Sequence, residues 1–167
     1  YPDDVRPYVS LPFPRVSELS AFDRSAQWRS LAPEETDPDD WEWASLYDMN
    51  AQLVGDAEDP YDVALRIESY LRSQFDYSLA PPDSGFSSPY AAFLFDTQSG
   101  YCQHFAGAMA LLLRYNDIPA RVAVGFTPGK KQGSEAYVVS TLNAHAWVEA
   151  YFPTVGWVAF DPTPGRN

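Results

Sequence analysis

The spacing of apolar side chains predicts an amphipathic helix in the first half of the chain. After Asp59–Pro60, which favours a helix start, apolar residues recur every three or four positions, as they do on one helix face. These apolar positions are Ala64, Ile67, Tyr70, Leu71 and Phe75. The polar residues between them, Arg66, Glu68 and Arg72, are predicted to face water. This helix is therefore expected to serve as scaffold.

Two further helices are predicted from capping residues. One runs from Asp39–Asp40 to about Val54 and offers four side chains for burial, Trp41, Leu46, Met49 and Leu53. The other is a short helix, Tyr90–Phe95, which Ser88–Pro89 would cap. At the start of the chain, four prolines within Tyr1–Pro14 exclude a helix interior and predict an extended arm.

The most apolar segment of the chain follows Gly100. Residues Tyr101–Leu113 are apolar on nearly every side, as expected of a helix buried in the middle of a domain. Gly100 interrupts the chain just before this segment, so Cys102 is predicted to lie at the start of the core helix.

From Ile118 onward the apolar pattern changes period. β-Branched and aromatic residues cluster between turn signals, which is typical of strands. The expected strands are Ala120–Phe126, Ala136–Ser140, His145–Phe152 and Trp157–Asp161. Because the helices come first and an antiparallel sheet comes last, the chain is predicted to have an α+β fold.

Length and composition predict one folded unit. The chain has 167 residues, of which 46% are hydrophobic and 16% aromatic. This supplies enough apolar surface for one core and too few residues for two comfortable domains. We expect a single domain, residues 1–167, with an N-terminal arm and helix over residues 1–58 and the core over residues 59–167.

The charge balance is strongly acidic. Eleven Lys and Arg against 23 Asp and Glu give a formal charge of -12, which would repel phosphate backbones, so nucleic acid is not expected as a partner. Many acidic residues precede the midpoint: Asp37, Asp39, Asp40, Glu42, Asp56, Glu58, Asp59 and Asp62. A solvated acidic surface is the simpler interpretation. A calcium site is the alternative, although the spacing lacks the loop glycine and distal glutamate of an EF-hand.

The chain has one cysteine and no membrane signal. A single cysteine excludes an intrachain disulfide and leaves a free thiol to explain. No apolar run approaches the roughly 18 to 20 residues that span a bilayer, and no signal-peptide pattern is present. Because the chain begins at Tyr1 rather than Met, we expect a domain excised from a longer protein whose targeting sequences lie elsewhere.

Cys102 lies where a helix start would favour its reactive form. A cysteine attacks a carbonyl carbon as the thiolate, and the unpaired amides and dipole of a helix N-terminus stabilise negative charge. Cys102 is therefore a candidate nucleophile. A small buried apolar residue is the alternative interpretation, and position alone leaves both open.

A nucleophilic cysteine needs an imidazole within reach, and the chain offers His104 and His145. Two residues along a helix turn a side chain by roughly 200°, so His104 should point away from Cys102 and have a structural role. His145 opens a predicted strand, where it shares a face with Trp147 and Glu149. His145 is the candidate base, and an ordinary strand histidine is the alternative.

Asp161 would hold His145 in one tautomer. It ends the next predicted strand, across a turn formed by residues 153–156. With this turn, the numbers of paired residues sum to about 309, which places Asp161 opposite Val148 and misses His145 by about one residue pair. A β-bulge or a longer side-chain reach is then required. Glu149 is the weaker alternative for the carboxylate.

Three sequence blocks resemble the transglutaminase-like domain of bacterial membrane-anchored proteins. The blocks are Gly100–Ala106 (GYCQHFA), Ile118–Val122 (IPARV) and Ala144–Glu149 (AHAWVE), followed by Gly156–Trp157 and Asp161–Thr163. The resemblance covers the chain from about Asp76 onward. The arm and the first helices match only loosely.

The resemblance implies a papain-like α+β fold, in which a buried helix carries a cysteine and an antiparallel sheet carries a histidine and an aspartate. Position by position, the implied catalytic residues are Cys102, His145 and Asp161, with no cofactor. His104 falls where the family often has histidine, which agrees with a structural role. The resemblance also implies an extracytoplasmic location, tethered to the membrane by segments outside this chain.

The expected reaction is cysteine-dependent acyl transfer at a carboxamide, such as a glutamine of a protein or peptide, through a thioester that an amine or water resolves. The Cys102 amide would be one oxyanion donor, and Tyr77 is a guess for the second. A peptidase or cell-wall amidase with the same triad is the alternative. Lys130 and Lys131 would either border the substrate cleft or be solvated loop residues.

A non-catalytic binding domain is the rival from another class. It would bind a cell-wall or membrane partner through aromatic residues such as Tyr8, Trp28, Trp41 and Trp43, most of which are expected in the core. A metal site is the least expected interpretation. Cys102 and His104 diverge on a helix, and a tetrahedral zinc site needs ligands that the chain does not supply.

Overall fold

The fold is described from a computed structural model, which covers residue 4 and residues 38–133 and 136–165. Apart from residue 4, the predicted arm Tyr1–Pro14 lies outside the described residues. The same holds for the aromatic groups of the rival binding surface, which are Tyr8, Trp28 and the side chains of Trp41 and Trp43.

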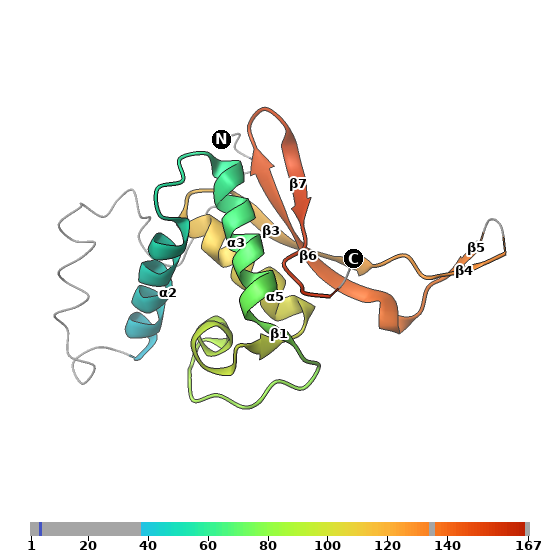
Figure 1. The fold of residues 1–167 in the computed structure, drawn as a ribbon, viewed down its shortest axis with the longest axis horizontal. Helices are drawn as coiled ribbons and strands as arrows, with labels where there is room; N and C mark the ends of the chain where they lie inside the picture. The colour runs from blue at the N-terminus through green and yellow to red at the C-terminus, as the bar shows by residue number, and fades with distance from the viewer. Residues whose placement is uncertain (1–3, 5–37, 134–135, 166–167) are drawn as a thin grey trace.

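The α-helices precede the main sheet along the chain (Figure 1). The helical segments are α2 (Pro38–Val54), α3 (Pro60–Gln74), α4 (Pro89–Ala91), the π-helix η3 (Ala92–Thr97), α5 (Cys102–Tyr115) and the 3₁₀-helix η4 (Thr141–Asn143). The strands are β1 (Asp76–Tyr77), β2 (Ser99–Gly100), β3 (Ala120–Phe126), β4 (Lys130–Gln132), β5 (Ala136–Val138), β6 (Ala144–Phe152) and β7 (Gly156–Phe160). The predicted α+β class is confirmed.

Helix α3 forms for the reasons that its sequence indicated. Asp59 caps it by accepting a hydrogen bond from the Tyr61 amide (2.8 Å), and Pro60 occupies the first helical position. Ala64, Ile67 and Leu71 have no exposed surface, as their spacing predicted. The helix is therefore held on the core by a continuous apolar face.

Helix α5 is the centre of the core. Every residue from Phe105 to Leu113 is buried, which confirms the predicted core helix. It contacts α2, α3 and α4 as well as β3 and β6 (Figure 1). Among the described helices, none combines the length and the apolar character that a membrane crossing requires.

The main sheet has three antiparallel strands in the order β3-β6-β7. Ala146, Val148 and Ala150 of β6 are buried at alternate positions, and α5 packs on this strand. The strand predictions over residues 120–126 and 145–152 are confirmed to within one residue.

The predicted strand Ala136–Ser140 is wrong in extent and in placement. Only Ala136–Val138 is a strand, and it pairs with Lys130–Gln132 in a two-stranded hairpin outside the main sheet. The hairpin projects from the body of the molecule (Figure 1), and its paired residues are all exposed. No described core element covers the hairpin. The apolar pattern of residues 136–138 therefore reflects strand formation without burial.

The short parallel pair β1–β2 positions the chain just before α5. Tyr77 pairs with Gly100, and the Ser78 amide donates a hydrogen bond to the Gly100 carbonyl (2.8 Å). Because Gly100 is two residues from Cys102, this pairing ties the segment after α3 to the start of the core helix.

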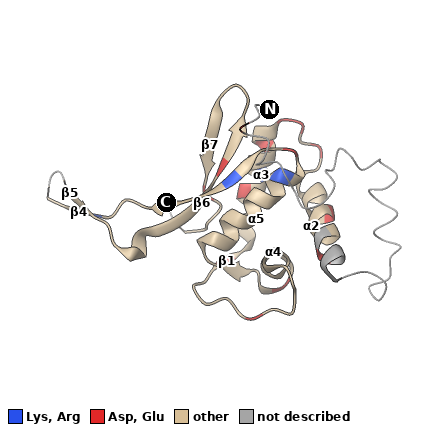
Figure 2. Cartoon of the chain, turned by 180° about the vertical axis from the view of Figure 1, so that it is seen from behind, with Lys and Arg blue, Asp and Glu red and all other residues tan. Residues whose placement is uncertain are grey.

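Most of the described acidic residues named above are exposed, as a solvated surface requires, and Glu42 is the exception; the exposed ones are Asp56, Glu58, Asp59 and Asp62. Figure 2 shows the described acidic residues spread over several elements. Glu42 of α2 is buried, with 4% of its surface exposed. Its carboxylate accepts hydrogen bonds from the amides of Ser87 (2.8 Å) and Ser88 (2.7 Å) and from the Ser87 hydroxyl (3.0 Å). Glu42 therefore ties the loop before α4 to α2.

Replacing Glu42 by alanine should lower the free energy of unfolding by about 2 to 3 kcal/mol. Leaving a buried donor without a partner costs about 1–3 kcal/mol, and the loss of the Glu42 carboxylate leaves the buried Ser88 amide unpaired. Urea unfolding followed by far-UV circular dichroism would measure the change. Glu58→Ala, which removes an exposed acidic side chain, is the matched control and should change stability by less than about 0.5 kcal/mol. Equal losses in the two variants would contradict this role of Glu42.

Candidate active site

Cys102 is the first residue of α5 and is half-buried. Tyr101, the residue before it, is extended (φ -108°, ψ 174°), so the helix begins sharply at the cysteine. The amides of the first helical turn have no carbonyl within the helix to bond to. The structure thus places the thiol at a helix N-terminus, beside backbone amides that carry partial positive charge.

His104 caps the helix that carries Cys102. Its Nδ1 accepts a hydrogen bond from the Tyr101 amide (3.3 Å), and its ring lies edge-on to the Tyr101 ring at 4.3 Å between centroids. Burial lowers the pKa of His104, which favours the neutral ring that this hydrogen bond requires. These contacts agree with the structural role predicted for His104.

Gly100 gives the His104 ring its room. A Cβ atom at Gly100 would lie 2.9 Å from both Cβ and Cγ of His104. A side chain at this position would push the imidazole away from the Tyr101 amide. The glycine before the cysteine is therefore a packing requirement of the helix start.

His145 and Asp161 are hydrogen-bonded. Nε2 of His145 lies 2.8 Å from Oδ2 of Asp161, and the histidine is 7% exposed. Because a carboxylate only accepts hydrogen bonds, Nε2 carries the proton, and Nδ1 of the neutral ring presents a lone pair. Nδ1 is buried and has no hydrogen-bond partner among the described residues. This arrangement leaves one basic nitrogen free for chemistry.

The register between β6 and β7 differs from the prediction by one residue. Val148 pairs with Phe160 and Phe152 with Gly156, with no bulge between them. Gly156 has a φ of 92°, which glycine readily adopts, and the turn therefore closes earlier than predicted. Asp161 then lies one residue beyond the strand, and its side chain reaches His145 without a bulge.

Glu149, the alternative carboxylate, has a different partner. Its Oε2 lies 2.7 Å from Nη2 of Arg121 on the neighbouring strand. The Arg121 guanidinium also stacks over the Trp157 ring at 4.0 Å from its centroid. The structure therefore joins Asp161, and not Glu149, to His145.

The elements that carry Cys102 and His145 pack against each other. Cys102 begins α5, and His145 is the second residue of β6, on which α5 packs. A pocket of about 270 Å³ opens beside the histidine, lined by Phe126, Thr127, His145, Trp147, Ala159, Phe160 and Asp161. Lys130 and Lys131 do not line this pocket and lie on the exposed hairpin. Among the described residues, no group of three or more His, Cys, Asp or Glu side chains is arranged to hold a metal ion.

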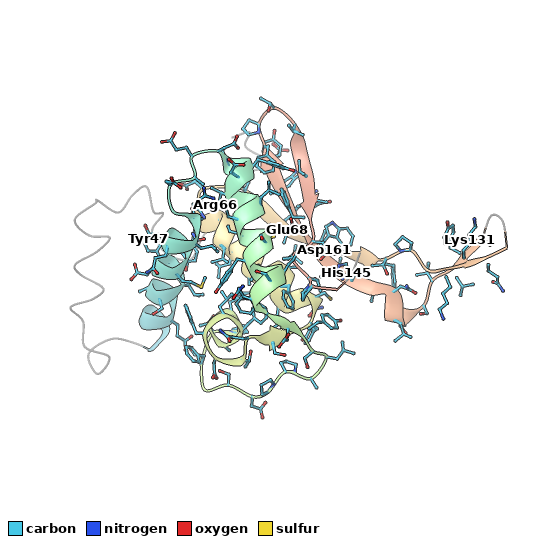
Figure 3. All side chains as sticks on the ribbon, in the orientation of Figure 1. Tyr47, Arg66, Glu68, Lys131, His145 and Asp161 are labelled. Carbon is cyan, nitrogen blue, oxygen red and sulfur yellow. The ribbon has the colours of Figure 1, made fainter. Side chains whose placement is uncertain are left out.

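The prediction that Glu68 and Arg72 face water is wrong. Oε1 of Glu68 accepts the Asp161 amide (2.9 Å), and Nη1 of Arg72 donates to the Asp161 carbonyl (2.8 Å). Figure 3 shows Glu68, Asp161 and His145 next to one another where α3 meets the end of the sheet. The only sequence signal for this contact is that Glu68 and Arg72 are four residues apart and so share a helix face.

The chain is similar to known proteins. The family model of the transglutaminase-like superfamily matches residues 47–162. A protein-glutamine gamma-glutamyltransferase of Pseudomonas aeruginosa is 37% identical over 153 residues, which cover 90% of this chain and 22% of that protein. The uncharacterized protein YebA of Bacillus subtilis is 40% identical over 126 residues, covering 68% of this chain and 17% of that protein. The chain therefore spans only a small part of these relatives.

Solved structures share the fold. The periplasmic domain of TgpA from Pseudomonas aeruginosa superposes with a TM-score of 0.63 at 34% identity, over 79% of this chain and 49% of that chain. A candidate cysteine protease from Cytophaga hutchinsonii superposes with a TM-score of 0.59 at 22% identity, over 98% of this chain and 43% of that chain, a likeness that shows the fold alone. The predicted transglutaminase-like and papain-like fold is confirmed.

The stability of the chain should fall between neutral and mildly acidic pH because of His104. Its pKa is lowered in the folded state, so below about pH 6.5 the unfolded chain binds a proton that the folded chain resists. The loss grows as the pH falls toward the lowered pKa. The free energy of unfolding of His104→Gln should depend less steeply on pH than that of the wild type between pH 7 and 5. Parallel pH curves for the two proteins would contradict this assignment.

Proposed function

Because the chain belongs to the transglutaminase-like superfamily, we propose that it catalyses cysteine-dependent acyl transfer at carboxamides through a thioester. One observation carries the proposal: His145 bonds Asp161 through Nε2, and its buried Nδ1 has no partner in the part of the chain that the structure describes. An oriented imidazole near a cysteine at a helix start is the arrangement that activates a thiol nucleophile.

In the first step the Cys102 thiolate attacks the carboxamide carbon. The carbon–sulfur bond forms, the carbon–nitrogen bond breaks, and the His145 imidazolium gives its Nδ1 proton to the departing ammonia. An amine or water then attacks the thioester while His145 accepts a proton from it, and the thiolate is released. The outcome is transamidation with an amine and hydrolysis with water.

Asp161 orients the imidazole and stabilises its charged form. Its Oδ2 accepts a hydrogen bond from Nε2–H of His145. This bond directs the other ring nitrogen, Nδ1, toward the reacting atoms. The second carboxylate oxygen, Oδ1, accepts the Thr163 amide (3.1 Å), so the carboxylate is held at both oxygens. A fixed carboxylate keeps the histidine in one tautomer throughout the reaction.

The oxyanion would be stabilised at the start of α5. The Cys102 amide belongs to the first helical turn and is a natural donor to the developing negative charge. Tyr77 remains the candidate for the second donor. Support for it comes from the β1–β2 pairing, which brings Tyr77 opposite Gly100, two residues before the cysteine.

The comparisons support a glutamine side chain as the acyl donor and an extracytoplasmic location. One relative is named as a protein-glutamine gamma-glutamyltransferase, and the related TgpA domain is periplasmic. We infer that this chain acts on a protein or peptide outside the cytoplasm, and that parts of a longer protein tether it to the membrane.

The proposal predicts that the chain incorporates a fluorescent primary amine into a glutamine-bearing protein, and that Cys102→Ala abolishes this reaction. In-gel fluorescence measures incorporation, and an enzyme-coupled ammonia assay measures release. Cys102-dependent labelling would support a transferase. Ammonia release or peptide cleavage without labelling would indicate a hydrolase instead, and no Cys102-dependent product in either assay would favour a binding domain.

Activity should require both residues that support the nucleophile. His145→Ala removes the base and should lower kcat/KM by about 10²- to 10⁴-fold. Asp161→Asn keeps the shape but favours the wrong tautomer, and it should also lower kcat by several orders of magnitude, up to about 10⁴-fold. Glu149→Gln, which changes a carboxylate bonded to Arg121, is the control. An equally large loss in this control would contradict the assignment of Asp161.

A further inference from the structure

Asp161 lies just beyond the part of the sheet that would fix its backbone. The β6–β7 pairing ends at Val148 and Phe160, so Asp161 is the first residue after the ladder. Both backbone groups of Asp161 instead bond to side chains of α3. Glu68 Oε1 accepts the amide at 2.9 Å, and Arg72 Nη1 donates to the carbonyl at 2.8 Å.

The two α3 side chains come from a rigid support. Glu68 and Arg72 are one helical turn apart, so they point to the same side of α3. Ile67 and Leu71, their neighbours in sequence, are fully buried and anchor this part of the helix in the core. The backbone of Asp161 is therefore bonded to a helix about 90 residues earlier in the chain.

We propose that Glu68 and Arg72 are positioning residues, which together clamp the backbone of Asp161 so that its carboxylate meets His145. Only the expected effect of the clamp on activity rests on the proposed function. The hydrogen bonds of the clamp do not depend on that function. Neither side chain touches His145 in the hydrogen-bond network described, so both act through Asp161.

The clamp matters because one hydrogen bond orients the imidazole. The Oδ2–Nε2 distance is 2.8 Å, and Asp161 is about one-third exposed at its side chain, with 32% of that surface accessible. The carboxylate keeps its bonds to His145 and to the Thr163 amide only while the Asp161 backbone holds it at this position. A misplacement of about 1 Å in a catalytic group can cost on the order of 100-fold in rate.

The hydrogen-bonding role of Glu68 does not depend on its charge. Burial raises the pKa of Glu68, whereas the Asp161 amide and the nearby Arg72 act to lower that pKa, and the Asp161 charge acts to raise it. An oxygen that accepts the Asp161 amide is present in a carboxylate, a carboxylic acid and an amide alike. Glutamine at this position should therefore preserve the clamp, and alanine should remove it.

The test compares Glu68→Ala, Arg72→Ala and Glu68→Gln with Arg66→Ala. Arg66 is the matched control, because it is also an α3 arginine that donates to a backbone carbonyl, that of Val54 (2.7 Å), away from Asp161. The first readout is the downfield proton NMR resonance of the His145 Nε2–H, identified by its absence in His145→Ala. The second readout is the rate at which iodoacetamide alkylates Cys102, which is specific because the chain has one cysteine.

We expect the His145 resonance to weaken or disappear in Glu68→Ala and Arg72→Ala and to persist in Glu68→Gln and Arg66→Ala. Alkylation of Cys102 at neutral pH, and kcat with an amide substrate, should fall about 10- to 100-fold in the two alanine variants. In an Asp161→Asn background, Glu68→Ala should cause no further loss of kcat. That non-additivity separates positioning from a general effect on stability.

Several outcomes would overturn the clamp. One is a folded Glu68→Ala or Arg72→Ala protein with an unchanged His145 resonance; another is a Glu68→Gln protein as impaired as Glu68→Ala. If an alanine variant does not fold, Arg72→Lys replaces it in the test. Lysine keeps the positive charge but offers a single nitrogen on a shorter side chain, so the His145 resonance should weaken to an intermediate degree. A wild type with the His145 resonance but no Cys102-dependent activity would instead overturn the proposed function and leave the clamp standing.

Discussion

The burial of helix α5 is the constraint on which the candidate site depends. Its residues Phe105–Leu113 are all buried, and the helix packs both on the other helices and on strand β6. A helix enclosed in this way cannot slide or rotate without opening cavities, which are costly in a close-packed core. Its first residue, Cys102, is therefore fixed relative to the strand that carries His145.

Polar groups at the site are satisfied one by one around this rigid centre. Nδ1 of His104 accepts a hydrogen bond from the Tyr101 amide at the helix start. Oδ2 of Asp161 accepts one from Nε2 of His145, and Oδ1 of Asp161 accepts one from the Thr163 amide. Buried polar groups without partners are costly, so such networks normally leave none open. Among the described residues at the site, Nδ1 of His145 and Oγ1 of Thr163 are exceptions, because both are buried without a hydrogen-bond partner. An open basic nitrogen is what a general base requires.

The core elements and the β4–β5 hairpin are physically separate. The core elements carry Cys102, His145 and Asp161, whereas the β4–β5 hairpin projects from the body of the molecule (Figure 1). Loops can change without disturbing a core that they do not help to pack. Family membership therefore describes the shared core, and function depends on the sites that this core carries.

The sequence by itself determined what depends on short-range pattern. The period of the apolar residues predicted α3, α5 and β6, and the glycine before Cys102 predicted the helix start, because capping and amphipathic spacing are local properties. Only the tertiary structure decided contacts between distant segments. Packing of α3 against the sheet turned Glu68 and Arg72 toward Asp161, about 90 residues later in the chain. The sequence pattern of a polar helix residue is the same whether its helix face meets water or the end of a strand. Packing decides between these two environments.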